Sequence, residues 1–194
     1  MSVEQVYDLM GRAGELPYGQ ARTIMVEEAL RLAEADADER LAYRVRHSLR
    51  QEYEQSGERA KAFATFARCL SDYDRNPELG EEYLLFWGFK GTVTGLTRFP
   101  EIPLDRTLAV LDDMERRYRL AGEGLQPVYM CRTVVTRHVH GAEAADEWYT
   151  RWHAAPRTHL SDCVGCDPSH KVVYLAARGR DEDAIAPRRA AAAR

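Results

Sequence analysis

Apolar residues along this chain recur every three or four positions, which is the spacing of amphipathic α-helices. Strict alternation of apolar and polar residues, the pattern of a strand, is nearly absent. Near the N-terminus, Val6, Leu9, Met10 and Ala13 share one face of a helix predicted over about residues 3–13. The pattern therefore predicts an all-α protein.

Glycines, prolines and short polar turns divide the rest of the chain into further helices. They are predicted over about residues 18–35, 39–55, 60–75, 78–99, 104–120, 128–139, 142–153, 172–178 and 181–186. The segment 78–99 is the most apolar of these. It contains Gly88, Gly91 and Gly95, and small residues at this spacing allow a neighbouring helix to approach closely. We therefore expect this segment to be a core helix.

Length and charge narrow the class of protein. A chain of 194 residues fits one domain or a short solenoid with a sizeable core. Its net charge of −4 shows no electrostatic footprint for nucleic acid. No apolar run approaches the roughly 20 residues that span a bilayer, and the N-terminus lacks the pattern of a signal peptide. We expect a cytoplasmic protein that binds neither nucleic acid nor membrane, with its cysteines reduced or bound to metal.

A recurring set of apolar and small residues lies on successive pairs of predicted helices. Its clearest copy is Leu49, Tyr53, Gly57, Ala62, Phe66 and Cys69, and a weaker copy is Leu175, Gly179 and Ala184. These residues describe two short antiparallel helices packed through a small-residue contact. Such a hairpin cannot bury its apolar face alone, so it predicts a stacked helical array.

These residues resemble the tetratricopeptide repeat family, whose unit is a helix-turn-helix of roughly 34 residues. Looser matches are Trp87, Gly91 and Ala109, then Tyr129, Ala145, Tyr149 and Trp152. Arg46 departs from the family, because it stands where the unit has its first aromatic residue. The resemblance implies a right-handed superhelical array of about four irregular antiparallel hairpins, forming a single domain over residues 1–194.

The resemblance also implies a surface for a partner. The first helix of each hairpin lines the concave face of the superhelix, and that face binds peptides or protein segments. In this chain the corresponding positions are Arg44, His47 and Gln51 on one helix, with Arg137 and His138 on another. Solvated surface is the simpler interpretation of any one of them. We expect a non-enzymatic scaffold or adaptor that binds a protein or peptide partner, with a homodimer as a further possibility.

A dense segment of potential ligands lies in a loop predicted over about 156–170. His159, Cys163, Cys166 and His170 give the spacing His-x3-Cys-x2-Cys-x3-His, with Gly165 between the two thiols. Two thiols at this spacing can share one zinc ion, and four ligands would make a closed structural site. Two other interpretations stay open, namely cysteines that pack as small hydrophobes and a redox pair.

The alternative function is a zinc-containing ligand sensor, or an accessory subunit of an enzyme or regulatory complex. A metal-dependent hydrolase is disfavoured, because it needs an open metal position for an activated water and a placed general base. We expect no enzymatic activity and no cofactor other than a structural zinc. The last residues, about 187–194, are predicted to be a frayed tail.

Overall fold

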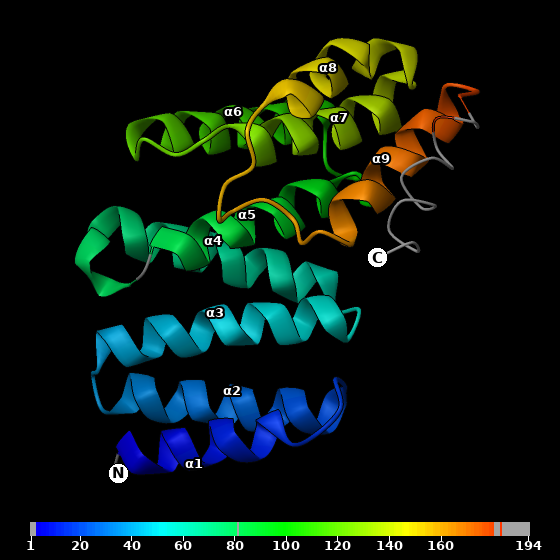
Figure 1. The fold of residues 1–194 in the computed structure, drawn as a ribbon. Helices are drawn as coiled ribbons and strands as arrows, with labels where there is room; N and C mark the ends of the chain where they lie inside the picture. Colours follow the sequence, from blue (N-terminus) through cyan, green and yellow to red (C-terminus); the bar gives the residue numbers. More distant parts are fainter. Residues whose placement is uncertain (1–2, 81, 181–182, 184–194) are drawn as a thin grey trace. The chain divides into compact units, whose positions relative to one another are not determined.

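The computed structural model describes residues 3–80, 82–180 and 183, and this part of the chain forms nine α-helices and no strand (Figure 1). The all-α class predicted from the apolar spacing is confirmed. Within the same residues, no helix combines the length and the apolar character needed to cross a bilayer. The tail predicted over 187–194, and the helix predicted over 181–186 apart from Asp183, lie outside the described residues.

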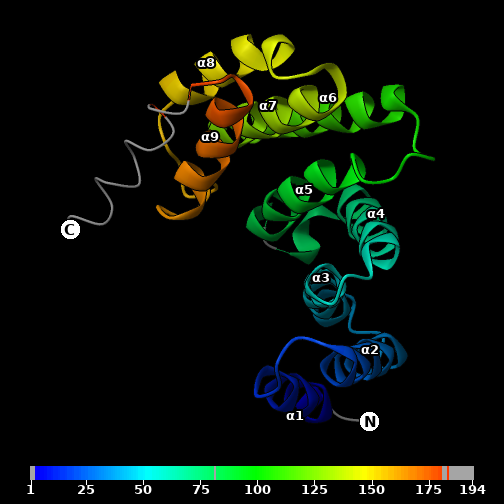
Figure 2. The ribbon, with the colours of Figure 1, turned by 90° about the vertical axis from the view of Figure 1, so that its right-hand side faces the viewer.

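The chain divides into two compact units, Met1–Thr92 and Val93–Arg194. The first contains the helices α1 (Val3–Gly14), α2 (Gln20–Ala35), α3 (Glu39–Gln55) and α4 (Arg59–Arg75), the short 3-10 helix η1 (Pro77–Leu79), and α5 (Glu82–Leu96) as far as Thr92. The helices α1 to α4 pack in chain order, each antiparallel to the one before it. Figure 2 shows α1 and α3 on one side of this stack and α2 and α4 on the other.

One continuous core runs through α1 to α4. It is built from the apolar positions that recur at helical spacing, among them Val6, Val26, Ala29, Val45, Leu49 and Ala62. Leu9 and Met10 of α1 pack against it and stay partly exposed. The predicted inner face of the first helix is therefore confirmed.

Asp38 caps the start of α3, and Gly57 allows the chain to turn after its end. The Asp38 carboxylate accepts a hydrogen bond from the Leu41 N–H at 2.9 Å, which caps the start of the helix. After Gln55, Gly57 adopts a positive φ of 84°, a conformation that glycine tolerates best. The chain can then reverse into α4 within a short turn, and the bounds of α3 match the prediction.

The second unit contains α6 (Leu104–Leu120), α7 (Gln126–His140), the 3-10 helix η2 (Glu143–Ala145), α8 (Asp146–Ala154) and α9 (Cys166–Ala177). Its large buried side chains include Tyr118, Val128, Trp152 and Leu160. The bounds of α6 match the prediction, whereas α9 begins at Cys166 and the loop predicted to reach 170 ends there. Pro168 does not prevent this earlier start, because the first turn of a helix has no partner for its N–H groups.

Candidate functional site

Three residues that the resemblance assigns to a partner surface line one cavity. Arg44, His47 and Gln51 recur at three- and four-residue intervals on α3 and therefore lie on one side of it. The cavity has a volume of about 190 Å³. Its other lining residues are Ser48 and Arg50 of α3 and Tyr83, Leu84 and Trp87 of α5. We call it the α3–α5 cavity, and all of its lining residues belong to the first unit.

Glycines allow α5 to pack closely against α3 and α4. A Cβ atom at Gly88 would lie 2.8 Å from Cε2 of Phe66 and 3.3 Å from Nε of Arg50. A Cβ atom at Gly91 would lie 2.6 Å from Oε1 of Glu54. The close approach predicted from the glycine spacing is confirmed at these two positions. It also brings the aromatic residues of α5 beside the stripe of polar residues on α3.

His47 is one of two buried polar residues that line the cavity, and the other is Arg50. Its side chain is only 4% exposed, and neither ring nitrogen has a hydrogen-bond partner in the described part of the chain. The ring of Tyr43 meets it edge-on, with 4.6 Å between the centroids. Burial, followed by the charges of Arg50 and Arg46, lowers the pKa of His47 to about 3. The imidazole is therefore neutral near pH 7 and offers one N–H donor and one acceptor.

Leaving such groups unpaired is costly. A buried donor or acceptor without a partner loses about 1–3 kcal/mol of solvation. Neither ring nitrogen is accessible to solvent, so an occupant of the cavity does not contact them in this structure. The sequence did not reveal this burial, because position 47 was expected to lie on an exposed face, as a partner-binding residue or as solvated surface.

The exposed residues that line the cavity are two aromatic residues of α5 and the polar residues Arg44 and Gln51 of α3. Tyr83 and Trp87 stack with 5.9 Å between their ring centroids, and they remain 41% and 37% exposed. The ammonium of Lys90, a buried residue that does not line the cavity, lies 3.4 Å from the centroid of the Trp87 ring in a cation–π contact. The side chain of Arg44 is exposed on α3. Trp, Tyr and Arg are the residue types that contribute most to protein interfaces.

The same surface continues onto the turn before α2. Gln51 donates a hydrogen bond from Nε2 to the Tyr18 hydroxyl at 3.2 Å. The guanidinium of Arg22 lies over the Tyr18 ring, 4.2 Å from its centroid. Tyr18 is 46% exposed. Aromatic and polar groups of the first unit thus extend from α5 across α3 to Tyr18.

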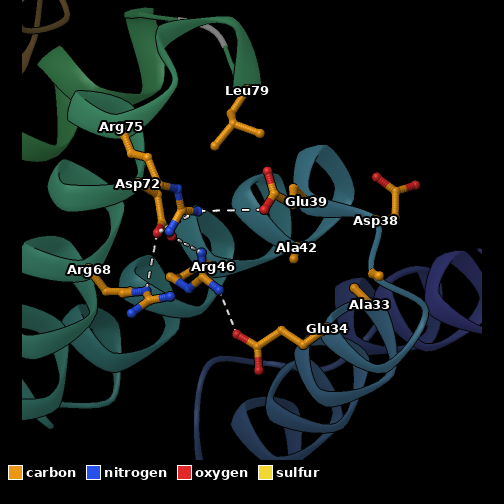
Figure 3. Close-up of a pocket in the computed structure, with 11 residues that line it drawn as sticks. Ala33, Glu34, Asp38, Glu39, Ala42, Arg46, Arg68, Asp72, Arg75 and Leu79 are labelled. Atoms are coloured by element: carbon orange, nitrogen blue, oxygen red, sulfur yellow. Dashed lines mark hydrogen bonds and ion pairs between the residues drawn. The ribbon is translucent and has the colours of Figure 1, made fainter.

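A larger cavity, of about 540 Å³, is lined by residues of α2, α3, α4 and η1 and of the turn before α3 (Figure 3). Three arginines approach Asp72 of α4, which is 2% exposed. Arg46 donates a hydrogen bond to its Oδ2 atom. Arg68 Nε and an Arg75 guanidinium nitrogen lie 3.2 Å and 3.4 Å from its Oδ1 atom.

The same network reaches two further carboxylates. Arg46 lies 2.5 Å from Glu34 of α2, and Arg75 lies 3.7 Å from Glu39 of α3. Carboxylates thus offset the arginine charges, and a structural role accounts for this cluster. The sequence did not predict this cluster. Arg46 stands out only as a departure from the tetratricopeptide pattern, and nothing in the sequence indicates which carboxylates it pairs with.

The cysteine segment of the second unit brings two of the four predicted metal ligands together. Cys163 and Cys166 are both exposed, and the backbone N–H of Cys166 donates to Cys163 Sγ at 3.2 Å. Hydrogen bonds from the Cys166 side chain and from the backbone N–H groups of Cys166 and Gly165 lower the pKa of Cys163. His159 lies 3.7 Å from Glu123, and His170 lies 3.5 Å from Asp162.

No group of three or more potential ligands close enough to hold a metal ion occurs among residues 3–80, 82–180 and 183. The two thiols lie in contact, while the two histidines are each placed beside a carboxylate. The zinc site therefore stays a prediction, to be tested by metal analysis.

A chain of buried hydrogen bonds anchors this segment. Asp167, in the first turn of α9, accepts hydrogen bonds from Gln126 Nε2 at 3.1 Å and from Trp152 Nε1 at 3.2 Å. The amide oxygen of the same glutamine, Gln126 Oε1, accepts a hydrogen bond from the Ser161 hydroxyl at 2.8 Å. Asp167 also pairs with Lys171 at 2.9 Å. Residues of α7, α8, α9 and the preceding loop are thereby joined.

Two predicted partner residues lie elsewhere. Arg137 and His138 are near the end of α7, where Arg137 is half-buried and His138 is exposed. They belong to the second unit, so the α3–α5 cavity does not contain them. Their assignment to a partner surface stays a prediction.

Comparison with known proteins gives no family for this chain. No family model, no curated protein and no solved structure matches it. The resemblance to tetratricopeptide repeats therefore rests on the residues quoted above, and the function has to be inferred from the geometry of the α3–α5 cavity.

Proposed function

We propose that this chain is a non-enzymatic interaction module, a scaffold or adaptor, that binds a peptide or helix of a partner protein at the α3–α5 cavity. The observation that supports the proposal most directly is the set of exposed side chains that line this cavity. The exposed side chains of Tyr83, Trp87 and Arg44 line one cavity, next to the buried residue His47. Interfaces concentrate their binding energy in Trp, Tyr and Arg around such desolvated pockets.

We also propose that the helices form irregular tetratricopeptide-like hairpins within a right-handed superhelix. The antiparallel order of α1 to α4 and their alternation between two sides support this arrangement. So does the turn at Gly57, which joins the two helices of the clearest copy. In such an array the first helices of successive hairpins, here α3 and α5, would share the binding face.

The groups of the cavity suit recognition better than catalysis. A histidine that acts as a general base needs a partner that orients it, and the His47 ring has none in the described part of the chain. Its pKa of about 3 also makes it a weak base near pH 7. Arg50, the buried cation beside it, is paired with Glu54 at 2.6 Å. These features favour a fixed binding surface.

A displayed library of random peptides tests the proposal. The full chain is immobilised, peptides are selected on it, and each enriched peptide is measured against variants by calorimetry. We expect Trp87→Ala and Arg44→Glu to weaken binding about tenfold or more, because each removes an exposed anchor of the mouth.

Matched controls change similar side chains away from the cavity. Ile24→Ala removes an exposed apolar side chain of α2, and Arg106→Glu reverses an exposed charge of α6. Both should bind the selected peptides as the unmodified chain does. Enriched peptides that bind the cavity variants and the controls equally well would refute the proposal.

A further inference from the structure

The two exposed cysteines of the second unit lie at the ends of one tight turn. The backbone N–H groups of Cys166 and Asp167 both donate to the carbonyl oxygen of Cys163 at 3.1 Å. A turn closed in this way holds the Cα atoms of its first and fourth residues within about 7 Å of each other. A disulfide needs Cα atoms roughly 4.4–6.8 Å apart, so the turn brings the two residues close to the range that a disulfide spans.

The side chains of this turn also meet. The Cys166 N–H donates to Cys163 Sγ at 3.2 Å, and the two thiol side chains are hydrogen-bonded to each other. Both side chains are exposed, so a small reagent can reach either sulfur from solution. Cys69 and Cys131 are buried instead, which is the state expected of cysteines that pack as small hydrophobes. The exposed pair therefore fits a reactive dithiol better than a packing role.

Contacts on both sides of the turn hold it in place. Arg157 donates a hydrogen bond to the carbonyl oxygen of Asp162, the residue before Cys163. The same guanidinium lies 3.4 Å from the carboxylate of Asp167, the residue after Cys166. This carboxylate is also the one that accepts the buried hydrogen bonds from α7 and α8. Anchors on both flanks of the turn restrict how far the two thiols can separate.

We propose that Cys163 and Cys166 form a reversible dithiol–disulfide site that exchanges electrons with small-molecule disulfides such as glutathione disulfide. A preformed turn favours the internal disulfide over a lasting bond to the small molecule, because the second thiol is already beside the first. The site lies within the second unit, so it does not depend on the function proposed for the α3–α5 cavity.

Oxidation by glutathione disulfide proceeds through two exchanges. The thiolate of one cysteine attacks a sulfur of the small disulfide, forms a mixed disulfide and displaces the first glutathione thiolate. The thiolate of the other cysteine then attacks the protein sulfur of the mixed disulfide and displaces the second glutathione thiolate. The two protein sulfurs give up two electrons, which reduce the small disulfide, and the two protons of the protein thiols pass to the two glutathione thiolates. Excess glutathione drives the same steps backward and restores both thiols.

The experiment equilibrates the full chain near pH 7 with a series of glutathione and glutathione disulfide mixtures, in the presence of a chelator that keeps metal ions off the thiols. Acid stops the exchange, and intact mass and peptide mapping identify the products. We expect conversion from the dithiol to a disulfide that joins Cys163 to Cys166, with little mixed disulfide at any mixture. Cys69 and Cys131 should stay reduced and serve as internal controls, because they are buried.

The same titration in urea tests whether the fold brings the thiols together. We expect the equilibrium constant for forming this disulfide to be about tenfold larger in the native chain than in the unfolded one. Arg157→Leu should move the native value toward the unfolded value, because it removes the contacts to both flanks of the turn. Arg151→Leu is the matched control, since Arg151 pairs with Glu147 on α8, and it should leave the native value unchanged.

Single substitutions trap the intermediate. Cys163→Ser and Cys166→Ser should each stop at a mixed disulfide between glutathione and the remaining exposed thiol. The inference is overturned if the unmodified chain keeps both thiols in excess glutathione disulfide, or if it accumulates mixed disulfides as the single variants do. Equal equilibrium constants in the native and unfolded chains would also overturn it, and so would a disulfide between two chains in place of the internal one.

Discussion

Arg46 of α3 donates a hydrogen bond to Asp72 of α4, and both side chains are almost completely buried. A buried pair of this kind gains little over an apolar pair, because both charges lose their hydration. Removing only one of the two charges is much more costly, because the other charge is then buried without a partner. The pair therefore predicts a strong asymmetry between single and double substitutions.

Asp72→Ala should lower the free energy of unfolding by about 3–5 kcal/mol, because it leaves the Arg46 guanidinium buried without its main partner. The double variant Arg46→Met/Asp72→Leu should recover most of that loss. Urea denaturation followed by circular dichroism measures both. If the double variant were as unstable as the single one, the cost would come from packing and not from the unpaired charge.

His47 predicts how stability depends on pH. Its pKa is about 3 in the folded chain, against an ordinary value of 6.5. Below pH 6.5 the unfolded chain binds a proton at this residue and the folded chain does not, so stability falls as the pH is lowered from 6.5 toward 3. Between pH 7 and pH 4.5 the loss from this group should be about 2–3 kcal/mol.

The comparison variant for this pH dependence is His47→Phe. Denaturation at a series of pH values should give a shallower decline for the variant than for the unmodified chain over the same window. Parallel curves would mean that the histidine is protonated in the folded protein, contrary to its burial.

Gly88→Ala should destabilise the protein by about 1–3 kcal/mol, because the added methyl would overlap the Phe66 ring. Gly11→Ala is the matched control, since a Cβ atom there meets nothing within 4 Å. That control should stabilise the protein by about 0.5–1 kcal/mol through helix propensity alone. Thermal unfolding of both variants gives the comparison, and equal stabilisation would show that α5 does not pack as described.

Alkylation should separate the four cysteines by exposure. Iodoacetamide should label Cys163 and Cys166 in the native, metal-free chain and leave Cys69 and Cys131 unmodified. Burial raises the pKa of Cys69 to about 12, so its thiolate is scarce as well as inaccessible. Peptide mapping by mass spectrometry identifies the labelled thiols. Fast labelling of Cys69 in the native state would contradict its place in the core.

Metal analysis tests the predicted zinc site. The zinc hypothesis expects about one zinc ion per chain purified without added metal, and none in the Cys163→Ser/Cys166→Ser variant, which should also melt at a lower temperature. Elemental analysis by plasma mass spectrometry measures the ratio. Zinc-free unmodified protein would reject the hypothesis.

The helices were more predictable than the chemistry of the cavity. The ranges of α3 and α6 follow from apolar spacing and from turn residues such as Gly57, which act locally. The start of α9 at Cys166 does not follow from these local signals. Pro168 suggests that the loop continues to that point, whereas proline is tolerated in the first turn of a helix. Proline and glycine indicate where a helix can end, but tertiary contacts determine whether the helix continues past that point.

Only the α3 residues of the cavity could be predicted from the sequence. Arg44, His47 and Gln51 came from the family resemblance, whereas Tyr83 and Trp87 of α5 were read as core residues. Nothing in the spacing of these aromatic residues distinguishes a half-exposed ring from a buried one. The burial of His47 likewise depends on α5, which is distant in the sequence. Such long-range pairings are set by packing and leave no local pattern.

The position of Asp167 has a consequence for how α9 opens. Helices ordinarily lose their amide protection first at both ends. In α9 the first turn is held by Gln126, Trp152 and Lys171 through one buried carboxylate. The last turn is held as well, because the buried Tyr174 donates a hydrogen bond to Asp146 and Arg178 pairs with the same carboxylate at 3.0 Å. Amide exchange in α9 should therefore not begin at one preferred end, and the helix should lose its protection together with the helices α7 and α8 that hold it.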